Sequence, residues 1–271
     1  MDYRDSVDLS DSRTQRASGG GGGGRMALGG GVGGLVLMLL VVFVGPRFGI
    51  NVSDLLGPSS GQDTQPAVQG SDLDHCKQKD VNVNTNRECR WLLYEKVLQS
   101  YWSKTATNYK YATVKLFSGT INTACGVGQT EMGPFYCSGD STVYIDDSYV
   151  GQLLKQLGAS GGDAAELYIV AHEFGHHVQN LDGTMRRVTR GTGADSAQVR
   201  LELQADCYAG VVFNQVMKDS NSPIKAVSKD DLLRIADAAR SVGDDHIQKQ
   251  QGGFVNPESW THGSSEQRQR W

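Results

Sequence analysis

Two histidines and a glutamate stand at a spacing suited to metal chemistry. His172 and His176 are four positions apart in the run His-Glu-Phe-Gly-His, with Glu173 beside the first. On a helix, such positions lie roughly 40° apart around the axis and about 6 Å apart along it, so both imidazoles can reach one ion. A glutamate at the second position is then placed to accept a proton from water. We therefore predict a zinc (Zn²⁺) site with Glu173 as the catalytic base; the competing interpretation is a buried helix whose histidines only pack.

A third ligand is expected from a second helix. Glu202 follows His176 by 26 residues, which leaves room for a turn and an antiparallel helix. Asp206 shares a helix face with Glu202 and is expected to hold a ligand histidine by its distal N–H. Two alternatives stay open. Asp182 has the metzincin spacing, although that arrangement wants a glycine where Gln179 stands, and Asp206 could itself be the third ligand.

Peptide hydrolysis also needs a hydrogen-bond donor for the negative charge that develops on the carbonyl oxygen. We predict His262 as this second catalytic residue and keep His246 as an alternative, because both lie in C-terminal segments that could fold back over the cleft. An ordinary surface histidine is the competing interpretation for each. His177 points away from His176 on a helix and is expected to pack or to lie at the surface.

The histidine pair stands in a predicted helix with recognisable ends. Asp163 and Glu166 have capping-box spacing at its start, and Gly183 is a stop signal after its last apolar residue. Apolar side chains recur between them at helical spacing. Gly175 inside this helix should cost about 1 kcal/mol relative to alanine. We expect the reason to be the close approach of another backbone near the site.

The other patterns predict an α+β domain with a small sheet. Further helices are expected over 88–104, 147–157, 199–217 and 229–242, and short strands over 112–117 and 143–146. Strand 143–146 precedes the active-site helix. We expect it to be an edge strand that runs past the cleft and holds a peptide by main-chain hydrogen bonds.

Several segments together resemble the bacterial neutral zinc metallopeptidase family. They are HEFGHHVQ at 172–179, LELQADCYAG at 201–210, GPFYC at 133–137, VYID at 143–146 and THGSS at 261–265. The resemblance runs from about Trp102 to the C-terminus. It implies a zincin-type domain with peptidase activity behind a single N-terminal membrane anchor. The spacing from Glu202 to Asp206 is also similar to that of thermolysin-like gluzincins.

The first 72 residues differ in composition from the rest. Residues 1–25 are polar and end in a glycine run, which predicts a disordered cytoplasmic tail. Residues 26–44 carry no charge and predict one transmembrane helix, at the short end of the spanning range. Residues 45–72 predict a linker, and 73–271 the zinc metallopeptidase domain. A cleaved secretory signal is the alternative, but no small-x-small cleavage site follows.

The arginines predict the orientation of that helix. Four arginines precede residues 26–44, and one lies within the next twenty residues. Because positive charge is retained on the cytoplasmic side, we predict a single-pass cell-membrane protein with a cytoplasmic N-terminus and an extracytoplasmic peptidase domain.

The cysteines favour the same location. The chain has five, at positions 76, 89, 125, 137 and 207, and none are in C-x-x-C pairs. Sequential pairing, Cys76 with Cys89 and Cys125 with Cys137, would close two short loops, each contributing on the order of 3 kcal/mol. Four cysteines allow three connectivities, so sequential pairing is a preference. Cys207 is expected to be a buried free thiol.

Composition narrows the function. The chain has 271 residues, 38% of them hydrophobic, which suits one enzyme domain with an anchor. A net charge of −4 without a basic cluster argues against nucleic acid as a partner. We predict a membrane-anchored zinc endopeptidase that acts on a peptide or protein substrate. The alternative is an inactive, zinc-stabilised binding or scaffold domain of the cell envelope, which would have no need of Glu173.

Overall fold

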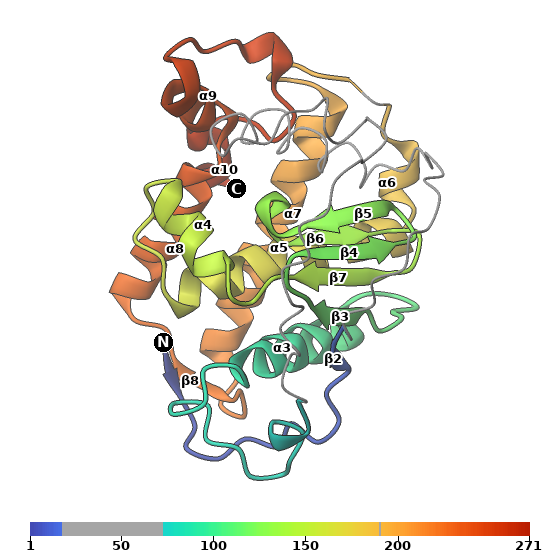
Figure 1. Ribbon diagram of the computed structural model, residues 1–271, viewed down its shortest axis with the longest axis vertical. Coiled ribbons are helices and arrows are strands. Elements are labelled where there is room, and N and C mark those ends of the chain that lie inside the picture. Colours follow the sequence, from blue (N-terminus) through green and yellow to red (C-terminus); the bar gives the residue numbers. More distant parts are fainter. Residues whose placement is uncertain (18–72, 190) are drawn as a thin grey trace, which may run out of the picture.

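The computed structural model describes residues 1–17, 73–189 and 191–271. These residues form a mixed α+β fold in which helices lie below and beside a small sheet (Figure 1). The helices are α3 (Arg90–Thr105), α4 (Val150–Gln156), α5 (Asp163–Leu181), α6 (Thr184–Arg187), α7 (Ala197–Lys218), α8 (Lys229–Ser241), α9 (Asp244–Gly252) and α10 (Ser265–Arg270), with 3-10 turns at Leu73–His75, Thr130–Met132 and Pro257–Ser259. The predicted α+β class with a small sheet and the predicted long helices are confirmed.

The main sheet has four strands in the order β2 (Thr14–Arg16), β3 (Thr113–Leu116), β7 (Thr142–Ile145) and β6 (Phe135–Cys137). The first three strands are parallel, and β6 is antiparallel to β7. Strands β4 (Thr120–Thr123) and β5 (Gly126–Gln129) form a separate hairpin, and β1 (Asp2–Tyr3) pairs with β8 (Ile224–Ala226). In the chain, β7 is followed by α4 and then by the active-site helix α5.

The prediction that residues 143–146 form an edge strand is wrong. Strand β7 lies between β3 and β6, and all four of its residues are buried. Because both faces of β7 are packed, its residues do not alternate between apolar and polar. The sequence pattern therefore gave no sign of whether the strand lies inside the sheet or at its edge. The edge on this side of the sheet is β6, which contacts the active-site helix α5.

Helix α5 begins at the predicted place, but for another reason. Gly162 is the N-cap, and no side chain caps the helix. Asp163 instead accepts a 2.7 Å hydrogen bond from the guanidinium of Arg90, and Glu166 pairs with Arg87. The two acidic residues therefore tie the start of α5 to α3 and the loop before it, and the predicted capping box is wrong.

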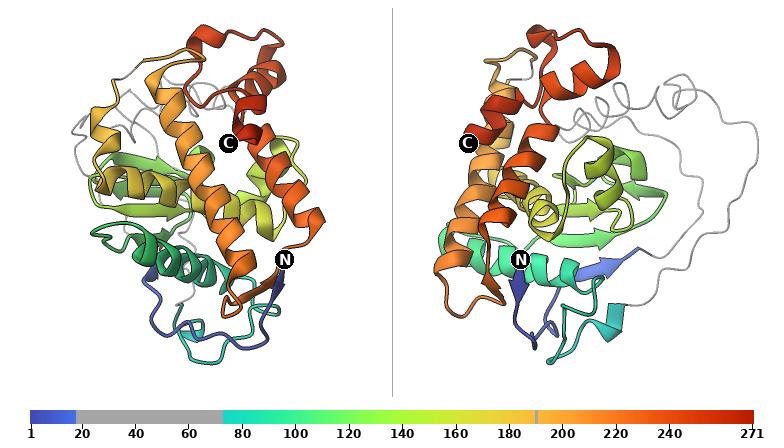
Figure 2. Two further views of the ribbon diagram at one scale, coloured as in Figure 1. Left: turned by 180° about the vertical axis from the view of Figure 1, so that it is seen from behind. Right: turned by 90° about the vertical axis from the view of Figure 1, so that its left-hand side faces the viewer.

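Gly175 lies where α5 and α7 approach most closely. A Cβ atom at this position would lie 2.9 Å from Ala205 Cα and 3.1 Å from Ala205 O. Any larger side chain would therefore push the two helices apart. The expected close backbone approach is confirmed, and it allows side chains of α7 to reach the histidines of α5. Figure 2 shows the two helices crossing in the middle of the molecule.

Residues 1–17 are ordered, which corrects this part of the predicted disordered tail over 1–25; residues 18–25 lie outside the described residues. Residues 1–17 pack on the domain through β1 and β2, and Tyr3, Leu9 and Thr14 are buried. The sequence concealed this because each strand is only two or three residues long and its partner lies about a hundred residues or more away. The predicted transmembrane helix 26–44 and linker 45–72 lie outside the described residues. No helix within the described ranges is long and apolar enough to cross a bilayer.

Both predicted disulfides are present. Cys76 is bonded to Cys89, and Cys125 to Cys137, so the pairing is sequential. The second bond ties β6 to the loop between β4 and β5. Cys207 is free as predicted, although it is half-buried rather than buried.

Candidate metal centre

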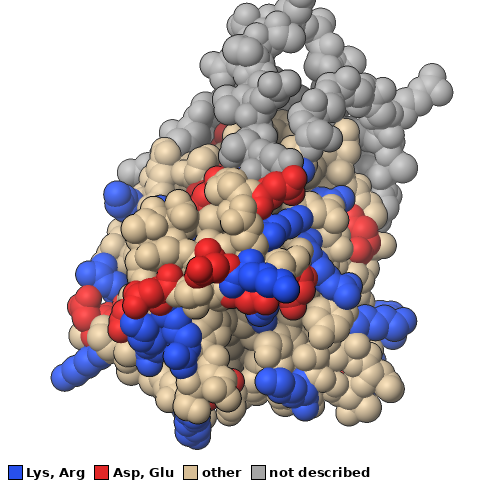
Figure 3. Space-filling model, turned by 90° about the horizontal axis from the view of Figure 1, so that it is seen from below, with Lys and Arg blue, Asp and Glu red and all other residues tan. Residues whose placement is uncertain are grey.

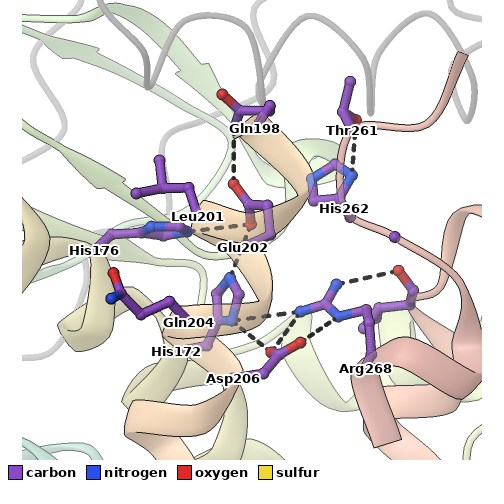
Figure 4. Close-up of polar contacts among 12 residues, drawn as sticks. His172, His176, Gln198, Leu201, Glu202, Gln204, Asp206, Thr261, His262 and Arg268 are labelled. Atoms are coloured by element: carbon purple, nitrogen blue, oxygen red, sulfur yellow. Dashed lines mark hydrogen bonds and ion pairs between the residues drawn. The ribbon is translucent and has the colours of Figure 1, made fainter. Parts of the chain in front are cut away.

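Helices α5 and α7 bring three predicted ligands together. The Nε2 atoms of His172 and His176 lie 3.2 Å and 3.3 Å from the same Glu202 oxygen, Oε2. All three side chains are buried, with Glu202 only 1% exposed. Figure 4 shows the two imidazoles and the carboxylate converging from the two helices. This is the one cluster of the described residues that joins two histidines to a carboxylate.

The donor set fits zinc. Zinc binds imidazole nitrogen and carboxylate oxygen at about 2.0–2.2 Å in a tetrahedron, whose edges are then about 3.4 Å long. The two nitrogen-to-oxygen distances of 3.2 Å and 3.3 Å match such edges. Three protein donors leave one of four positions for water, which distinguishes a catalytic from a structural site. His172, His176 and Glu202 are therefore the residues that would hold the ion.

A buried network orients His172. Its Nδ1 lies 2.7 Å from Asp206 Oδ1, so the ring donates to the carboxylate there and presents Nε2 to the cluster. Arg268 of α10 donates to both oxygens of Asp206, at 2.8 Å each, and the hydroxyl of Tyr168 donates to Oδ1 at 2.6 Å. Although burial opposes ionisation, Arg268 and His172 hold the pKa of Asp206 well below its usual range. The predicted supporting position of Asp206 is what the structure shows, and Asp206 does not join the cluster itself.

His176 and Glu202 are each held by a glutamine. Gln179 Oε1 accepts from His176 Nδ1 at 2.9 Å, while its Nε2 donates to the Leu201 carbonyl at 2.7 Å. Gln198 donates to the second oxygen of Glu202, Oε1, at 3.0 Å. Burial would raise the pKa of Glu202, but the neighbouring histidines hold it far below the usual value. The carboxylate is therefore charged and has one oxygen committed to the cluster.

Glu173 lies beside the cluster without being part of it. The side chain is 9% exposed, and burial raises its pKa above the usual value, with the two histidines opposing and Glu202 adding to the rise. The backbone of Tyr136, in edge strand β6, also opposes this rise in pKa. The helix therefore presents a carboxylate of increased basicity beside the cluster.

His262 reaches the site from the loop before α10. The backbone N–H groups of Thr261, His262 and Gly263 all donate to Asp244 Oδ2, at 2.7, 2.7 and 3.0 Å. His262 Nδ1 lies 3.2 Å from Asp244 Oδ1. Burial alone would lower the pKa of His262, but Asp244 and the charge of Glu202 raise it. Figure 4 shows the imidazole facing the cluster, so the predicted position of His262 holds and its catalytic role stays a prediction.

The other candidates lie away from the cluster. Asp182 is exposed at the end of α5, where it accepts from the Thr184 N–H, so the metzincin-like alternative has no support. His246 donates to the Leu157 carbonyl on another face of the molecule. His177 is fully buried between the Tyr136 hydroxyl and the Lys110 carbonyl, so of the two positions expected for it, packed or at the surface, it takes the packed one.

Sequence reasoning missed Gln179, Arg268 and Asp244. Gln179 lies three positions after His176 and so shares its helix face, a signal that was available. Arg268 and Asp244 gave no local signal, because each acts on a residue brought close only by folding: Arg268 is 62 positions from Asp206, and Asp244 is 18 from His262.

Replacement of Asp244 by asparagine tests whether it positions His262. The variant should keep its zinc, lose roughly 10- to 100-fold in turnover, and show the alkaline limb of its pH–rate profile shifted to lower pH. The sign follows because Asp244 raises the pKa of His262, so its loss lets the imidazolium deprotonate earlier. Asp245→Asn is the matched control, since Asp245 accepts from Ser265 instead. An equal shift in both variants would show a general loop effect.

The geometry of the site is typical of one class of enzyme. A buried His–His–Glu cluster on two helices, with a free glutamate at the second position of the histidine motif, is typical of zincin metallohydrolases. The family model described as "Putative neutral zinc metallopeptidase" matches residues 1–271. The chain belongs to this family.

The chain is also similar to individual proteins over most of its length. The "Uncharacterized protein Rv2575" of Mycobacterium tuberculosis is 40% identical over 231 residues, which cover 82% of this chain and 78% of the relative. The "Uncharacterized protein YpfJ" of Escherichia coli K12 is 36% identical over 241 residues, covering 86% and 79%. No solved structure matches the chain.

Proposed function

We propose that the protein is a zinc-dependent endopeptidase whose domain works outside the cytoplasm. The observation that carries this proposal is Glu173, a buried carboxylate of raised pKa beside a His–His–Glu cluster whose members are each held by a further side chain. A site that only stabilised the fold would have no use for an additional basic group beside its ligands.

Each residue then has a distinct task. Zinc bound to His172, His176 and Glu202 would lower the pKa of a water molecule and polarise the peptide carbonyl. Glu173 accepts the proton of the attacking water and passes it to the leaving amine. His262, whose pKa is raised by its contact with Asp244, donates a hydrogen bond to the oxygen on which charge develops.

The sheet edge supports a peptide as the substrate. Strand β6 ends the sheet and packs against α5, the helix that carries Glu173. An extended peptide added along this edge would be held by main-chain hydrogen bonds and would pass the cluster. The Cys125–Cys137 disulfide and the hydrogen bond between Tyr136 and His177 fix β6 in place.

The two disulfides support a location outside the cytoplasm, because disulfides persist in oxidising compartments. This proposal does not depend on the predicted transmembrane helix over residues 26–44, which lies outside the described part of the chain.

The competing function is an inactive zinc-stabilised scaffold, and hydrolysis of labelled casein by the purified full chain separates the two. We expect one zinc per chain by elemental analysis, hydrolysis that a chelator abolishes, and recovery when zinc is added back. Zinc binding without hydrolysis of casein or of a diverse peptide library would favour the scaffold.

A further inference from the structure

The first 17 residues run along one end of the domain and join two separate sheets. Strand β1 pairs antiparallel with β8, and β2 pairs in parallel with β3, in register from Thr14 with Val114 to Arg16 with Leu116. Between them, Val7 and Val81 exchange two backbone hydrogen bonds of 3.0 Å. The right-hand view of Figure 2 shows this segment, in blue, lying against the domain at both of its strands.

Side chains of the segment are part of the core. Tyr3, Leu9 and Thr14 are 1%, 0% and 0% exposed. The hydroxyl of Tyr3 lies 3.2 Å from that of Tyr94 in α3. Burial of apolar surface favours the packed state in proportion to the area removed from water. Without the segment, β3 would also present an unpaired edge.

Polar contacts fix the same arrangement. Arg16 makes a double hydrogen bond to Asp147, at 3.0 and 2.9 Å. The Ser12 hydroxyl donates to Glu95 Oε2 at 2.7 Å, and burial raises the pKa of this carboxyl group. Figure 3, which views this end of the molecule, shows basic and acidic side chains interleaved over it. A segment that merely rested on the surface would not supply partners to a buried glutamate.

We propose that residues 1–17 are a permanent part of the folded domain and lie on the same side of the membrane as residues 73–271. Paired strands lie about 4.8 Å apart, whereas the hydrocarbon core of a bilayer is about 30 Å thick. Strands β2 and β3 therefore cannot pair across a membrane. A single crossing within residues 26–44, with a cytoplasmic N-terminus, is incompatible with these contacts, whatever path residues 18–72 take.

Thiol labelling of intact cells that express the full chain tests this topology. Ser10 and Ser220 are exposed, one in the segment and one in the domain, so Ser10→Cys and Ser220→Cys each provide a reporter in a Cys207→Ser background. A membrane-impermeant maleimide should label both or neither before the cells are permeabilised. Labelling of only one would overturn the proposal. Labelling of neither would uphold the shared side of the membrane but contradict the extracytoplasmic location. The topology proposal and the proposed location can therefore fail separately. Neither labelling result depends on peptidase activity.

Cross-linking tests the strand pairing itself. Gln15 and Lys115 are register partners in β2 and β3, so Gln15→Cys with Lys115→Cys should form an intramolecular link with a short bifunctional maleimide in intact membranes. The matched control is Gln15→Cys with Lys249→Cys, because Lys249 lies in α9 at the opposite end of the molecule in Figure 1. Equal yields in the two pairs, or no link in the first, would show that the segment is not docked.

Discussion

Replacement of Glu173 by alanine is expected to leave zinc bound and to reduce turnover by roughly 10²–10⁴-fold. Glu173 is not among the clustered donors, so the ion should lose no ligand. Its carboxylate is nevertheless the group beside the cluster whose pKa burial raises, and the variant loses this acceptor for the proton of water. The measurement is the kcat for a casein-derived peptide alongside the zinc content of the same sample.

A second glutamate provides the control for this variant. Glu266 is exposed on α10, so Glu266→Ala should match the parent protein in both zinc content and turnover. Glu173→Gln keeps the shape but removes the base, and it should be as impaired as Glu173→Ala. Hydrolysis at the parent rate by either Glu173 variant would remove this residue from the mechanism and favour the scaffold function.

The centre of the site was predictable because its residues stand close together in the sequence. His172, Glu173 and His176 stand on one helical turn and a half, so their relative positions follow from helix geometry alone. Predicting Glu202 as a ligand also required that α5 pack on α7. Gly175 indicated this packing in the sequence, because a glycine inside a helix allows another backbone to approach closely. The 2.9 Å that would separate a Cβ at Gly175 from Ala205 Cα shows why glycine stands there.

The surroundings of the site were not predictable for the opposite reason. Arg268 stands in a short, charged C-terminal helix that looks like solvated surface, and only the folded chain brings it to Asp206. Asp244 looks like an ordinary first-turn acidic residue of α9, yet it binds three successive amides of another loop. For Arg268 and Asp244, the residue type indicates the charge of the side chain. The group that each side chain binds is determined by long-range packing.

The strands show the same limit. The pattern at 143–146 located a strand but not its neighbours, so the edge position was assigned to β7 when β6 holds it. Residues 2–3 and 14–16 are too short for a period of two to be recognised. Their position depends on open edges of β8 and β3 that exist only once the domain has folded.

Replacement of Glu202 by alanine is expected to abolish zinc binding, whereas Asp182→Ala should leave it unchanged. Glu202 Oε2 lies 3.2 and 3.3 Å from the two histidine nitrogens, so its loss leaves two neutral donors and removes the one negative charge of the cluster. Asp182 is exposed and binds the Thr184 amide, so its loss changes only the end of α5. Elemental analysis of the purified variants measures zinc per chain, and hydrolysis should disappear with the metal in Glu202→Ala alone.

Two further outcomes make the test of Glu202 decisive. Because the carboxylate is buried and charged, its removal could also loosen the helix pair, so the far-UV circular dichroism and thermal midpoint of Glu202→Ala must be measured. Glu202→Asp, which keeps the charge but shortens the reach, should bind zinc more weakly than the parent and more tightly than Glu202→Ala. If a folded Glu202→Ala retained a full equivalent of zinc while Asp182→Ala lost it, the third ligand would be Asp182, and the hydrolase site would follow the metzincin arrangement.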